Sequence, residues 1–217
     1  MEWYILALLS AIFLGISPII SKKILMKEHA TEFVTTTLLI MSIAFLPIIG
    51  KVDFGVRWEI WVLMFSKAVL ISIALILGFK ASRHMEISSV EPLKNLSVVF
   101  VTFLAFIFLS ERVDFMQGIG IILVLIGSYS LEIYKTPMRS LLVHSKYLVY
   151  FLIAVFLASI SVIFDKVMLS YTSVWTILVI PTFLMTVMLL IYQAIVFKGF
   201  KDIAHVINIS GIGILLV

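Results

Sequence analysis

The chain has 217 residues, of which 63% are hydrophobic and only 13% are charged. Soluble globular domains average about 45–50% apolar and about 25% charged residues, so too few polar side chains remain here to coat a soluble globule. The apolar surplus indicates a protein that faces lipid. The lack of cysteine excludes disulfides and thiolate metal sites. The net charge is +4, and the sequence contains no cluster of basic residues that would indicate nucleic acid as a partner.

Seven segments approach the length of about 20 apolar residues that a helix needs to cross a hydrocarbon core of roughly 30 Å. Charged and turn-forming residues separate them, and aromatic residues such as Trp3, Trp58 and Tyr147 stand at their ends, as expected at a membrane interface. The predicted fold class is all-α, a polytopic transmembrane helical bundle that is multi-pass in the cell membrane. In chain order the predicted spans are 3–21, 32–50, 58–79, 88–110, 115–133, 147–164 and 174–196.

An eighth apolar run begins near Val206 and reaches Val217. These residues would rise only about 18 Å as a helix, which is too short to cross the bilayer. The run predicts a chain that stops inside a helix, as a truncated product, a fragment or a re-entrant end would.

An internal repeat links 11–25 to 154–168 without gaps, at an offset of 143. We predict a first five-helix repeat at 1–134 and a partial second repeat at 146–217, with two helices and the start of a third. Because five is odd, the incomplete second copy would lie inverted in the membrane, an arrangement typical of transporters, and a complete copy would reach about residue 277. The identical positions are Ala11, Phe13, Leu14, Ile20 and Lys23, which match Ala154, Phe156, Leu157, Ile163 and Lys166.

The segment 86–132 contains the most informative motif. A Phe-Leu-Ser sequence at 108–110 leads into an acidic-basic pair, and a Gln-Gly-Ile-Gly sequence opens the next helix at 117–120. This order and spacing resembles the EamA-type family of the drug/metabolite transporter superfamily, which implies transport of small metabolites, amino acids or drugs. Two positions depart from the family pattern: Val98 stands where a proline is frequent, and 33–49 lacks the usual arginine. The residues that carry the resemblance are Glu111, Arg112, Gln117, Gly118, Gly120 and Gly127.

The chemistry of these motif residues predicts structural roles. Glu111 and Arg112 lie in a turn too short to leave the interface, so we expect them to anchor the hairpin through each other or through the helix dipole. Gly118, Gly120 and Gly127 lack side chains, so we expect them to let the fifth helix approach a neighbour closely.

Lys67 is the clearest candidate for a functional residue. It follows Trp58 by nine residues in a predicted 22-residue span, which places it near mid-depth, and Thr102 in the fourth span lies at a similar depth. An ionisable group inside lipid costs about 2.5–3.5 kcal/mol on insertion scales, so it needs a reason. One explanation for this lysine is functional: it belongs to a substrate or counter-ion site. The alternative is that the helix is shifted by a turn along the membrane normal, so that the lysine side chain reaches the interface.

A polar stripe in the fourth span extends the candidate pathway. Glu91, Lys94, Asn95, Val98 and Thr102 are spaced as one face of a helix. Such a face should meet protein or a water-filled cavity, although the first acidic-basic pair could also be a simple surface ion pair. We therefore predict that the four polar members of this stripe contribute, with the mid-depth lysine, to a solute pathway.

Positive charges at the helix ends bear on topology. Lys23 and Lys166 occupy equivalent repeat positions, and we expect them, with Asp165, to anchor helix ends at the interface. Odd-numbered connections hold ten Lys and Arg against four in the even-numbered ones, which places the N-terminus outside. The resembled family is usually drawn with cytoplasmic termini, so the two arguments conflict.

The function predicted from these features is secondary transport of a small metabolite by alternating access. The alternative is a non-transporting or partner-dependent truncated membrane protein. An enzyme is not expected, because the predicted spans contain no histidine and the aspartates lie at helix ends, and no ATP-binding signature is present. The expected partners are the lipid bilayer and a small-molecule substrate. The sequence leaves open whether the chain forms a homo-oligomer. No cofactor or metal is expected.

Overall fold

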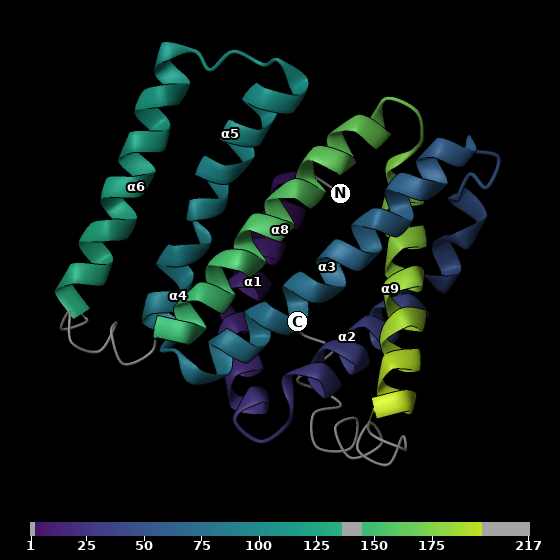
Figure 1. The fold of residues 1–217 in the computed structure, drawn as a ribbon, viewed down its shortest axis with the longest axis horizontal. Helices are drawn as coiled ribbons and strands as arrows, with labels where there is room; N and C mark the ends of the chain where they lie inside the picture. Colours follow the sequence, from purple (N-terminus) through teal and green to yellow (C-terminus); the bar gives the residue numbers. More distant parts are fainter. Residues whose placement is uncertain (1–2, 136–144, 197–217) are drawn as a thin grey trace.

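The computed structural model describes residues 3–135 and 145–196, and within these ranges it contains helices and short connections but no strand. The prediction of an all-α bundle is confirmed (Figure 1). The elements are α1 (Trp3–Leu25), α2 (Ala30–Phe45), the 3-10 helix η1 (Leu46–Lys51), α3 (Trp58–His84), α4 (Ile87–Lys94), α5 (Leu96–Leu109), α6 (Phe115–Lys135), α8 (Ser145–Leu169) and α9 (Val174–Val196).

Six of the predicted spans are long and apolar enough in the described part of the chain to cross a membrane. They are Ala7–Leu25, Ala30–Lys51, Trp58–His84, Ser89–Leu109, Lys146–Leu169 and Val174–Ile195. The predicted span at 115–133 corresponds to α6, and among its described side chains the apolar stretch is Phe115–Ser128. The eighth apolar run, at 206–217, lies outside the described residues.

The predicted span at 88–110 is confirmed as Ser89–Leu109, but the chain divides it into α4 and α5 with a break at Asn95. The backbone N–H of Asn95 donates to the carbonyl of Pro92 (3.1 Å), and the N–H of Val98 donates to the carbonyl of Asn95 (3.1 Å). These tighter i to i+3 bonds interrupt the α-helical pattern. Pro92 contributes because it supplies no backbone N–H and its ring crowds the preceding turn.

The helical bundle has two ends, called here the upper face and the lower face. The upper face, at the top of Figure 1, carries the connections 110–114 and 170–173, and the lower face carries α4 and the connection from α1 to α2 (Figure 1). Helices α3 and α8 run between them side by side. A cluster that includes Ile60, Met64 and Met168 packs them near the upper face, and another that includes Ala81 and Phe151 packs them near the lower face.

Helices α2 and α9 form a second contact surface that contains hydroxyl groups. The hydroxyls of Ser42 and Thr186 lie 2.7 Å apart, and Thr186 also donates to the carbonyl of Leu38 at 3.1 Å. Both hydroxyl-bearing residues are buried. Such bonds satisfy polar groups that would otherwise face hydrocarbon, and they hold neighbouring helices together.

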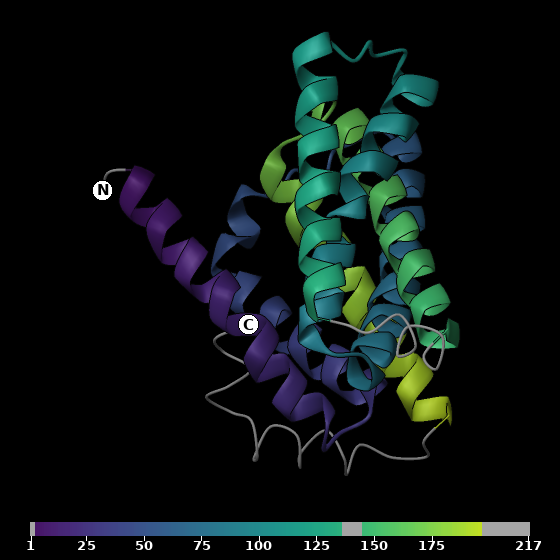
Figure 2. The same ribbon diagram turned by 90° about the vertical axis from the view of Figure 1, so that its left-hand side faces the viewer.

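Helices α1 and α6 lie at the periphery. The N-terminal half of α1 leans away from the other helices (Figure 2), and side chains such as Leu8 and Leu14 are exposed. The predicted close packing of Gly118, Gly120 and Gly127 was wrong for the contacts described, because a Cβ added at any of them would meet nothing within 4 Å. The reason is that α6 makes few contacts with the rest of the bundle, so no neighbouring atom comes within 4 Å of a Cβ at these positions.

The helix boundaries agree with the repeat offset. Shifting the bounds of α1 by 143 gives 146–168, against Ser145–Leu169 for α8, and shifting the first residue of α2 gives 173, against Val174 for α9. This agreement supports the inverted repeat, but the repeat and the division into 1–134 and 146–217 stay predictions.

Candidate functional site

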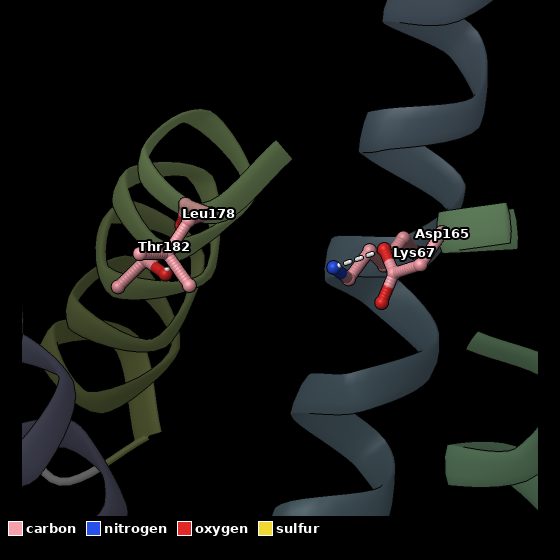
Figure 3. A network of polar contacts seen from close by, with 4 residues as sticks. All are labelled: Lys67, Asp165, Leu178 and Thr182. Carbon is pink, nitrogen blue, oxygen red and sulfur yellow. Dashed lines mark hydrogen bonds and ion pairs between the residues drawn. The ribbon is translucent and has the colours of Figure 1, made fainter. Parts of the chain in front are cut away.

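Lys67 forms an ion pair that joins the two predicted halves of the chain. Its Nζ atom in α3 lies 2.5 Å from Oδ1 of Asp165 in α8. The lysine side chain is only 13% exposed and the aspartate side chain is 33% exposed. Figure 3 shows the ammonium directed toward the side on which α9 lies, where the hydroxyl of Thr182 donates to the carbonyl of Leu178 at 2.7 Å.

Helix α3 is longer than the predicted span. It runs to His84 instead of residue 79, so Lys67 lies about 13 Å from its first residue and about 25 Å from its last at 1.5 Å per residue. Lys67 is therefore a third of the way along the helix, and its depth in the membrane stays a prediction. It is still inside an apolar span, where a charged group requires a partner.

Asp165 is not part of the interfacial cluster that the sequence suggested. Its carboxylate faces α3 and neutralises Lys67, whereas the neighbouring Lys166 forms an ion pair with Glu111 in the connection from α5 to α6. Glu111 therefore anchors its hairpin to α8 rather than to Arg112, which was one of the two expected forms of the anchor; the role of the helix dipole stays a prediction. Two consecutive residues of α8 thus reach two different elements of the first half.

Two weaker contacts join the same halves at the upper face. The backbone N–H of Asp53 donates to the hydroxyl of Thr176 at 2.9 Å, and Thr176 is fully buried. The ammonium of Lys51 lies 5.0 Å from the ring centroid of Trp175. Together with the two ion pairs, these contacts tie α8 and α9 to the first half at this face.

A cavity of about 110 Å³ lies at the lower face between α1, α3 and α4. Its lining combines hydroxyls, charges and apolar groups: Ser17, Pro18, Ser21, Lys22, Leu25, Phe79, Ser82, Ile87, Val90, Glu91 and Lys94. Ser17 precedes Lys22 by five residues, so the polar lining extends about 8 Å along α1. The cavity offers both charge signs and hydrogen-bonding groups to a small polar solute.

Lys22 fixes one wall of this cavity. Its ammonium donates to the carbonyls of Ser82, Arg83 and Met85 at 2.6, 2.8 and 2.6 Å. These carbonyls lie at the end of α3, where the backbone lacks helical N–H partners and a cation is favourable. The lysine therefore docks the C-terminal end of α1 onto the C-terminal end of α3.

The predicted polar stripe is divided between two places by the break at Asn95. Glu91 and Lys94 pair at 2.7 Å and line the lower cavity. The side-chain amide of Asn95 donates to the hydroxyl of Ser128 in α6 at 2.9 Å. Thr102 donates to the carbonyl of Val98 within α5, and both residues face a different pocket, so the expectation of one continuous polar face was wrong.

That second pocket is a groove of about 470 Å³ between α5 and α6. Glu111 and Arg112 line its upper end, and its walls are mostly aliphatic. The side chain of Gln117, another motif residue, accepts a hydrogen bond from the backbone N–H of Asp114 at 3.0 Å and so caps the start of α6.

Three residues take part in these sites, although the sequence predicted for them only a place at helix ends or at the interface. Asp165 and Lys166 pair across the halves, and Lys22 forms the docking contact at the lower face. One signal could have drawn attention to two of them, because Lys22 and Asp165 occupy equivalent positions at the offset of 143. Their partners could not have been deduced, since each lies on an element far away in sequence.

Comparison with known families agrees with the helical architecture and with the motif in 86–132. The model of the EamA-like transporter family matches residues 1–132, which is more than half of the chain. The chain belongs to the EamA-like transporter family. No curated protein matches the sequence closely enough to add a relative. As a member of this family, the chain is a membrane protein of the drug/metabolite transporter type, with a bundle that contacts the lipid bilayer.

Proposed function

We propose that this EamA-like chain is a secondary transporter that moves a small polar metabolite by alternating access. The observation that carries the proposal is the lower-face cavity, which places Glu91, Lys94 and three serines among membrane-spanning helices. Polar lining of this kind is unnecessary for packing in lipid, and intramembrane ionisable groups commonly mark solute pathways. Family membership alone gives neither the substrate, nor the pathway, nor the mechanism, so these three points are what is proposed.

In this mechanism a solute reaches the cavity from the lower face, between α1 and α4. The upper face is held closed by the pairs Lys67–Asp165 and Glu111–Lys166, which must separate for a solute to leave there. At the lower face α3 and α8 also touch, through the stacked rings of His84 and Tyr147 at 4.0 Å. The conformational change would therefore move α8 against α3 at the upper face while that ring contact acts as the pivot.

Cysteine accessibility gives a direct test, because the chain has no native cysteine that would react in the background. Ser17→Cys places a thiol in the cavity, and Ser159→Cys places one in the buried surface of α8 as a matched control. In oriented vesicles, a membrane-impermeant maleimide added from the lower face should label the first thiol and leave the second unlabelled. If the thiol at position 17 reacts from neither side, the cavity is not a solute pathway.

Transport itself is measured after the substrate class has been found. Purified full-length chain is screened for thermal stabilisation against amino acids, nucleosides, polyamines and sugars, and any hit is tested as a radiolabelled solute in proteoliposomes. Uptake above empty vesicles that is blocked by maleimide at position 17 supports the proposal. Binding without uptake would favour the alternative of a non-transporting or partner-dependent membrane protein.

A further inference from the structure

The groove between α5 and α6 is the larger of the two described pockets, at about 470 Å³ against about 110 Å³. The connection 110–114 joins the two helices at the upper face, and from there they run side by side toward the lower face (Figure 1). Aliphatic side chains cover most of the walls, including Val101, Ala105, Ile121 and Val124. The hydroxyl of Thr102 donates a hydrogen bond within its own helix, so this part of the groove does not require a polar group in the molecule that occupies it.

Gly120 leaves part of the groove wall without a side chain. This residue lines the groove, and a Cβ added there would meet no atom within 4 Å. A water molecule occupies about 30 Å³ in the liquid, so the groove volume corresponds to about 15 groups of that size. That number of methylene-sized groups matches one acyl chain of a phospholipid.

The connection at the upper end of the groove carries one cation and one anion whose side chains have no partner among the described residues. The carboxylate of Glu111 is engaged by Lys166. Arg112 lines the groove, whereas Asp114 does not line it and follows two residues later in the same connection. Both are exposed, and within residues 3–135 and 145–196 neither side chain forms a hydrogen bond or an ion pair.

We propose that the groove binds a phospholipid with a zwitterionic headgroup that ends in a primary ammonium. The phosphate would accept hydrogen bonds from Arg112, whose guanidinium suits phosphate oxygens. The ammonium would donate to Asp114, and one acyl chain would lie along the groove past Gly120. A purely anionic headgroup suits this end of the groove less well, because Asp114 repels it, and a quaternary ammonium cannot donate a hydrogen bond to that carboxylate. The site is separate from the lower cavity and does not depend on the proposed transport function.

Native mass spectrometry of the full chain tests the proposal. The protein is stripped of lipid in detergent and mixed with equal amounts of palmitoyl-oleoyl phosphatidylethanolamine, phosphatidylcholine and phosphatidylglycerol. We expect the phosphatidylethanolamine adduct to predominate by about tenfold, the factor that corresponds to one good charge-assisted contact. Arg112→Gln, on an exposed connection, should abolish this preference.

Two glycines of α6 provide a matched pair for locating the site. Gly120→Leu fills the groove and should lose the adduct, whereas Gly118→Leu, two residues earlier and so about 200° around the helix, does not line the groove and should keep it; neither new Cβ meets a neighbour. Unchanged thermal midpoints confirm that both variants fold. Predominant phosphatidylglycerol binding, equal binding of all three lipids, or equal losses for the two glycine variants would each overturn the proposal.

Discussion

Breaking the Lys67–Asp165 pair should destabilise the bundle more than any change to an exposed charge. The variants Lys67→Met and Asp165→Leu each leave one charge without its partner inside an apolar span. Removing one member of a buried pair costs about 3–5 kcal/mol. A third of the Asp165 side chain is exposed, so water can solvate part of the remaining charge, and we expect about 2–3 kcal/mol for each single change.

The double variant Lys67→Met with Asp165→Leu separates the pair from its surroundings. Replacing both charges by apolar side chains is often neutral, so we expect the double variant to lie within about 1 kcal/mol of the wild type. The resulting coupling energy should be about 2 kcal/mol or more, well above the value for residues that do not interact. Lys23→Met, an exposed lysine at the end of α1, serves as the control and should change stability by less than about 0.5 kcal/mol.

Reversible unfolding in mixed micelles of a mild detergent and sodium dodecyl sulfate measures these differences, with the fluorescence of the four tryptophans as the signal. Each variant gives a free energy of unfolding, and the four values close a double-mutant cycle. The reasoning is refuted if the single changes add without coupling, or if Lys67→Met costs no more than the Lys23 control.

Three further predictions concern single contacts. Lys22→Met removes the ammonium that binds three carbonyls at the end of α3, so the unfolding free energy should fall by about 2 kcal/mol, and hydrogen exchange should rise first in the last turn of α3. Thr186→Val keeps its size but removes the hydroxyl contact with Ser42, which should cost about 0.5–1.5 kcal/mol by the same unfolding assay; an unchanged value would contradict a bonded contact. Gly78→Ala should be tolerated, because its Cβ would lie 3.5 Å from the Cβ of Ala154, whereas Gly78→Leu should push α3 from α8 and cost about 1–3 kcal/mol; equal thermal midpoints for the two variants would contradict this.

The helices were largely predictable because their signal is local. An apolar run of sufficient length must satisfy its backbone internally in lipid, so the predicted starts at 58 and 174 agree with α3 and α9. The end of α3 was missed because its last turns carry Lys80 and Arg83, which hydropathy assigns to a connection. The helix continues there, since Lys80 lies over the ring of Tyr150 at 5.6 Å and basic residues suit the end of a helix.

The break at Asn95 was not predicted, although Pro92 was visible in the sequence. Proline near the start of a helix is usually tolerated, and nothing local distinguishes a capped start from an interruption. The amide of Asn95 finds its partner on α6, so the conformation of this segment depends on a neighbour that sequence spacing does not identify.

By itself, the sequence determined that the protein is a helical membrane bundle, that it resembles one transporter family and that Lys67 requires a reason to lie in lipid. Composition and apolar length decide these points, and both are properties of short segments. Only the tertiary structure decided which charges meet. Lys67 and Asp165 are 98 residues apart, and Glu111 and Lys166 are 55 apart, so the packing of α8 against the first half brings each pair together. Charge pairing in lipid depends on which helix faces meet, and that is a property of the assembled bundle.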